Sequence, residues 1–110
     1  MAATRSPAEP VNGRATLASL GEGRWSLSGD LLFENAARLL EEGVAAFGTE
    51  SRVEIDLAQV GRVDSAGLAL LVEWSVAARG GGLGVHYRNV PPVLGALAGI
   101  SDLTQFLDGA

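Results

Sequence analysis

The segment 53–87 constrains the fold most, because its apolar residues change from strand periodicity to helical periodicity and back. Residues 53–57 (VEIDL) alternate between apolar and acidic side chains, which is the pattern of a strand with one buried face. An apolar helix is predicted over about 66–79, and residues 83–87 (LGVHY) again alternate as a strand. A strand–helix–strand unit of this kind predicts parallel strands in one sheet with the helix packed against it.

The sequence of residues 15–48, upstream of this unit, predicts a hairpin and another helix. Two short strands, 15–20 and 25–28, are joined by Gly21-Glu22-Gly23, a hairpin signal. A helix is predicted over 33–47, with Asp30 as its N-cap and Gly48 at its end. Its apolar stripe consists of Phe33, Ala36, Ala37, Leu40, Val44 and Phe47.

Downstream, the chain predicts a third helix. Pro91-Pro92 suits a helix N-terminus and opens a helix over about 93–98, after which 100–107 is expected to pack back on the sheet. The 110 residues fit one domain. We therefore predict a single α/β domain in the order β-β-α-β-α-β-α, with a mixed four-stranded sheet and helices packed against it. Residues 1–12 are expected to form a flexible tail, and 13–110 the domain.

The charge distribution argues against several partners. There are 8 basic and 13 acidic residues, and all the basic ones are arginines scattered singly along the chain. Nucleic acid and anionic lipid both require clustered basic residues, so neither is expected as a partner. The chain has no cysteine, no apolar signal segment near Met1 and no apolar stretch of about 20 residues. We therefore expect a cytoplasmic protein without direct membrane insertion.

The sequence contains few residues in a pattern that indicates catalysis. His86 is the only histidine and lies in a predicted strand, where a surface role is more common than a role as a base. The glycine-rich run 80–84 follows a helix and precedes a strand, the reverse of a phosphate-binding P-loop. No acidic or histidine cluster has metal-ligand spacing. We predict no enzyme activity, no cofactor and no metal.

The segment 63–68 (VDSAGL) stands between a strand and the apolar helix. Either Asp64 or Ser65 could cap that helix by accepting hydrogen bonds from its free N–H groups. A phosphate on Ser65 would also be favoured at a helix N-terminus, although Asp64 beside it would repel the added charge.

The helix predicted over 66–79 is apolar on two sides. One stripe, which suits burial on the sheet, consists of Leu68, Leu71, Val72 and Val76. Leu70 and Trp74 fall on a different side, together with Gly67. Because a small domain has little material for a second covering layer, we expect a partner protein to cover this side.

These segments resemble the STAS domain. The resemblance rests on 55–57 (IDL), on the Asp64-Ser65-Ala66-Gly67 motif between a strand and a helix, and on the strand 83–87, and it covers most of 14–107. It implies the α/β fold described above and a role in binding other proteins.

Within that family, three segments are similar to the small cytoplasmic STAS subunit of Mla-type phospholipid ABC transporters: 29–33 (GDLLF), 70–74 (LLVEW) and 89–91 (NVP). The resemblance implies a non-catalytic subunit that binds the transporter ATPase and, through it, the permease at the inner membrane, in maintaining outer-membrane lipid asymmetry. The expected contact consists of Asp64, Ser65, Ala66, Gly67, Leu70 and Trp74.

The related branch of the family, the anti-sigma factor antagonists, remains the alternative. Its members carry a phosphorylatable serine in the motif, as this chain does at Ser65, whereas the best-known transporter subunit has threonine there. The alternative function is therefore regulation by phosphorylation of Ser65.

Overall fold

The computed structural model describes residues 15–47, 50, 52–80 and 84–107. Within them the chain forms, in order, β1 (Thr16–Gly21), β2 (Arg24–Leu31), α1 (Phe33–Phe47), β3 (Arg52–Val63), α2 (Ser65–Gly80), β4 (Gly84–Arg88), α3 (Pro92–Ile100) and α4 (Thr104–Leu107). The expected tail 1–12, Gly48 and residues 81–83 of the glycine-rich run lie outside the described residues. No helix in the described part of the chain is long and apolar enough to cross a membrane.

The four strands form one mixed sheet in the order β1-β2-β3-β4. β1 and β2 are antiparallel, and β2–β3 and β3–β4 are parallel. The hairpin turn has positive φ at Gly21 (88°), Glu22 (56°) and Gly23 (77°), a conformation that glycine adopts without a steric penalty. The predicted mixed α/β sheet is therefore confirmed, with α1 and α2 as the two crossovers between parallel strands.

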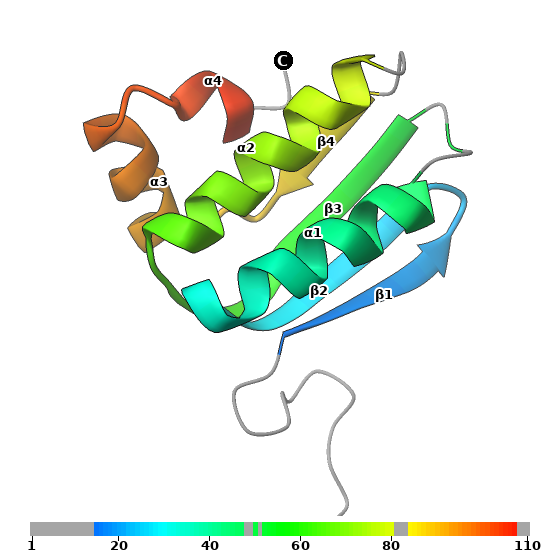
Figure 1. The fold of residues 1–110 in the computed structure, drawn as a ribbon, viewed down its shortest axis with the longest axis horizontal. Coiled ribbons are helices and arrows are strands. Elements are labelled where there is room, and N and C mark those ends of the chain that lie inside the picture. Colours follow the sequence, from blue (N-terminus) through cyan, green and yellow to red (C-terminus); the bar gives the residue numbers. More distant parts are fainter. Residues whose placement is uncertain (1–14, 48–49, 51, 81–83, 108–110) are drawn as a thin grey trace, which may run out of the picture.

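The core lies between one face of the sheet and the two helices α1 and α2, which run side by side across that face (Figure 1). Val53, Ile55 and Leu57 of β3 are completely buried there, as their alternation predicts. Tyr87 of β4 is also buried, and its hydroxyl donates to the Leu71 carbonyl of α2 at 2.6 Å. Burial raises the pKa of Tyr87 well above its usual value, and the nearby Ser75 hydroxyl offsets a smaller part of this rise. The phenol is therefore a neutral donor that ties β4 to α2.

The buried stripe of α1 differs from the predicted one. Its buried residues are Asn35, Leu39, Gly43 and Phe47. Phe33 is 80% exposed and Val44 50% exposed, so the prediction that both face the core is wrong. Asp30 is also not the N-cap of α1, because it belongs to β2 and its carboxylate accepts from the backbone N–H of Arg62 at 2.8 Å.

The contact between α1 and α2 is close because α1 has a glycine where α2 has a tryptophan. The Trp74 indole lies against Gly43, so closely that a Cβ on that glycine would overlap the ring. The indole N–H donates to the Leu40 carbonyl at 3.4 Å. Phe47 packs edge-on against Trp74, with ring centroids 5.4 Å apart, and edge-on against Trp25 at 5.3 Å.

This packing corrects the prediction for the second apolar side of α2. Trp74 is 1% exposed and Leu70 3% exposed, so α1 covers the side that a partner protein was expected to cover. The second layer is therefore supplied internally. Val76, expected on the buried stripe with Leu68 and Leu71, is instead half exposed. The C-terminal segment is also placed differently, because the main contacts of α4 are with α2 and α3 rather than with the sheet.

We predict that Gly43→Ala destabilises the domain by about 1–3 kcal/mol, because the added methyl group would displace the Trp74 ring. Denaturant unfolding followed by tryptophan fluorescence measures this change. Gly95→Ala is the matched control, since Gly95 is also helical and a Cβ there meets no atom within 4 Å. The control is expected to be neutral or to stabilise by about 0.5–1 kcal/mol. Equal stability of the two variants would contradict the proposed contact.

Candidate functional site

The side chain of Asp64 joins the starts of both long helices. Its Oδ1 accepts from the backbone N–H groups of Ala66 at 2.9 Å and Gly67 at 3.1 Å, in the first turn of α2. Its Oδ2 accepts from the backbone N–H of Phe33, the first residue of α1, at 3.1 Å. The first N–H groups of a helix have no partner within the helix, and the positive ends of two helix dipoles meet here. One carboxylate therefore caps two helices.

The motif residues around Asp64 have separate roles. Of the two candidate caps, the structure identifies Asp64, and Ser65 is the exposed first residue of α2. No hydrogen bond to the Ser65 hydroxyl is present within the described part of the chain, which leaves this group available at the surface. Gly67 is buried, and a Cβ there would overlap the Leu31 carbonyl at the end of β2. The motif requires glycine because the first turn of α2 lies directly against that strand.

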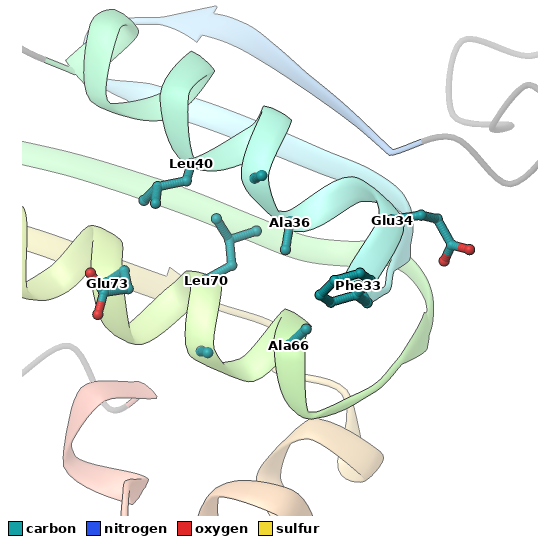
Figure 2. A pocket seen from close by; sticks show the side chains of 9 residues that line it. Phe33, Glu34, Ala36, Leu40, Ala66, Leu70 and Glu73 are labelled. Carbon is teal, nitrogen blue, oxygen red and sulfur yellow. The ribbon is translucent and has the colours of Figure 1, made fainter.

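An apolar groove of about 490 Å³ runs between α1 and α2, beginning beside this turn. Figure 2 shows the side chains of Phe33, Ala36 and Leu40 from α1 facing Ala66 and Leu70 from α2. The remaining lining residues are Glu34, Ala37, Ala69 and Glu73. Phe33 forms one end of the groove and is almost entirely exposed, so an apolar surface lies open next to Ser65.

The predicted site residues are only partly brought together at the surface. Ser65 is exposed, and Asp64 and Ala66 beside it are partly exposed. Leu70 is buried but lines the bottom of the groove, whereas Gly67 and Trp74 are enclosed in the domain. The α1 side of the groove could not be recognised from the sequence, because the helical spacing of its residues is the same as that of a buried stripe. These residues are Phe33, Ala36, Ala37 and Leu40.

A second hollow is polar and smaller, about 190 Å³, and is lined by Leu20, Arg24, Trp25, Glu54, Asp56, Arg88 and Asn89. Two of its acidic groups have partners within the hollow: Glu54 pairs with Arg88 at 3.4 Å, and Asp56 accepts from the Asn89 amide at 2.9 Å. No group of three metal-ligating side chains occurs in the ranges that the structure describes. The groove is therefore the stronger candidate for a binding surface.

We predict that Asp64→Asn destabilises the domain by about 1–2 kcal/mol, although asparagine is ordinarily as good an N-cap as aspartate. The reason is that an amide has only one oxygen and would turn its NH2 group toward one of the two helix starts. Thermal and denaturant unfolding measure the change. Ser65→Ala is the control, with an expected change within about 0.5 kcal/mol. An Asp64→Asn variant as stable as the wild type would show that the second cap contributes nothing.

Comparisons with known proteins agree with this fold. No curated protein matches the sequence. The structure is similar to that of the anti-sigma factor antagonist SpoIIAA in its unphosphorylated form, with a TM-score of 0.65, 14% sequence identity and 84% of each chain covered. At that identity the likeness shows a shared fold. The family model described as "Mlab, STAS domain" matches residues 16–108, which is most of the sequence. This chain therefore belongs to the STAS domain family.

Proposed function

We propose that this chain is a non-catalytic subunit that binds the ATPase of an inner-membrane phospholipid-transport ABC complex and supports its assembly and activity. In this proposal it lies in the cytoplasm and reaches the permease and the membrane only through the ATPase. The biological role is maintenance of outer-membrane lipid asymmetry. The observation that carries the proposal is the exposed Ser65 turn next to an open apolar groove. The choice of the ATPase as the partner rests on the resemblance of the segments 29–33, 70–74 and 89–91 to the transporter subunit.

The structure supports a binding role for this end of the domain in two ways. The turn is held rigidly, because Asp64 fixes the starts of both helices, so little ordering is needed when a partner binds. The groove is apolar, and exposed apolar surfaces bordered by polar residues are typical of protein contacts. The contact that we propose consists of Asp64, Ser65, Ala66 and Phe33, with Leu70 at the bottom of the groove.

The second candidate is an anti-sigma factor antagonist that is switched by phosphorylation of Ser65. One observation favours it: the Ser65 hydroxyl is exposed and takes no part in capping, so a kinase could reach it. The carboxylate of Asp64 already accepts from the N–H groups of Ala66 and Gly67, which a phosphate at this helix start would otherwise use, but this aspartate belongs to the motif that both branches share. We rank it second because the segments 29–33, 70–74 and 89–91 resemble the transporter subunit.

We predict that Ser65→Ala changes the affinity for the purified ATPase subunit by less than about threefold, whereas Ser65→Glu weakens it by about tenfold or more. The glutamate would place an unpaired charge in a mostly apolar contact beside Asp64. Isothermal titration calorimetry measures both affinities, and unfolding curves check that both variants are folded.

Mass spectrometry of the intact protein, purified from its own host, separates the two functions. We expect no phosphate on Ser65 and an ATPase that co-purifies with the chain. A stoichiometric phosphate on Ser65 would contradict the transporter function and support the anti-sigma factor antagonist.

A further inference from the structure

The groove has an acidic border. Glu34 and Glu73 lie near its two ends (Figure 2), and Glu41 follows Glu34 by two turns on the exposed side of α1. None of the residues lining the groove is basic. The nearest arginine along α1, Arg38, is bound elsewhere, to Glu42 at 3.0 Å and to the Ala15 carbonyl at 2.8 Å. Among the residues that the structure describes, the groove therefore combines apolar lining with acidic side chains at its border and no basic residue in its lining.

We propose that the groove binds an amphipathic helix of the partner protein, with aliphatic or aromatic side chains on one face and Arg or Lys residues beside them. This inference rests on the proposed function and specifies the segment of the ATPase that makes the contact. From Phe33 to Leu40 the groove spans about 10 Å, which is two helical turns and matches anchors spaced at i, i+3 or i+4, and i+7. The acidic border would pair with the basic residues that flank such anchors.

The backbone of the groove walls argues against an extended peptide as the occupant. Both walls are α-helices, whose N–H and C=O groups are already bonded within the helix. A strand lying here would find no edge to pair with, and its own backbone groups would lose water without gaining partners. A helix satisfies its own backbone and presents only side chains to the groove.

The charge of the border argues against two further occupants. A second copy of this chain seated in the groove would bring Glu34 and Glu73 of each copy close together, and like charges in a contact repel. An anionic lipid surface would be repelled in the same way. Among these occupants, a basic amphipathic helix is the one that both the shape and the charge of the groove favour.

The test measures binding of the full chain to the purified ATPase subunit at low and high salt. Phe33→Ala is expected to weaken binding by about tenfold or more, because it removes the exposed ring at the end of the groove. Ile100→Ala is the matched control: Ile100 is 85% exposed, on α3, and its loss is expected to change affinity by less than about twofold. Both side chains are so exposed that neither variant should lose stability.

Two charge-reversal variants test whether the acidic border contributes to binding. Glu73→Lys is expected to weaken binding by about fivefold at low salt, with a smaller difference at high salt because salt screens exposed charges. Glu22→Lys, in the β1–β2 hairpin turn, makes the same change in net charge outside the groove and is expected to bind as the wild type does. Equal binding of Glu73→Lys and Glu22→Lys would overturn the role of the acidic border.

A photo-cross-linking amino acid that replaces Phe33 identifies the segment that occupies the groove. The expected product joins Phe33 to a helical segment of the ATPase that carries Arg or Lys beside its apolar face. Cross-links to a strand or to an acidic segment, or a dimer of this chain that Phe33→Ala dissociates, would overturn the proposal. If the wild type binds the ATPase and Phe33→Ala binds equally well, the groove inference alone is wrong. If the wild type does not bind, the proposed function is wrong and this inference with it.

Discussion

The carboxylate of Asp64 is the interaction on which the arrangement of the helices depends. It accepts from the first N–H group of α1 and from two N–H groups of α2, and the Asp64 backbone N–H donates to the Leu31 carbonyl at 3.2 Å. The ends of β2 and β3 and the starts of α1 and α2 therefore meet at one residue. Since both helices start at this point, they run in the same direction across the sheet, and the groove between them opens beside Ser65.

A second constraint, the contact of Gly43 with Trp74, separates the core from the groove. The indole ring lies between α2 and Gly43 of α1 and packs edge-on against Phe47, which in turn packs edge-on against Trp25. Leu70, one turn earlier on α2, is buried and lines the groove. The core is therefore complete without Phe33, whose ring remains in water and gains little from the fold. The exposed ring of Phe33 contributes little to the stability of the fold. An exposed aromatic side chain at this position is instead what a partner-binding surface requires.

Parts of this structure that depend on one element alone could be predicted from the sequence. The alternation in 53–57 gave the correct buried face of β3, because a period of two leaves no ambiguity. The buried face of α1 could not be predicted, since Asn35 and Gly43 occupy core positions while Phe33 and Val44 do not. Cover of Trp74 by α1 is a contact between elements, and so is the bond from Asp64 to Phe33, 31 residues apart. Periodicity within one element contains no information on such contacts.

The division of roles between Asp64 and Ser65 determines what a phosphate on Ser65 would act on. A phosphate on Ser65 would lie next to the carboxylate that holds α1 and α2 together, and the repulsion would act on the bonds that fix both helix starts. Phosphorylation would therefore disturb the domain as well as its binding surface. A permanent contact that uses a neutral hydroxyl has no such effect, since the Asp64 carboxylate keeps the three hydrogen bonds that it accepts. Because both branches of the family carry this motif, the repulsion does not by itself separate a constitutive subunit from a phosphorylation switch. The groove is the part of the surface that differs from the shared motif, and in our proposal it selects the partner.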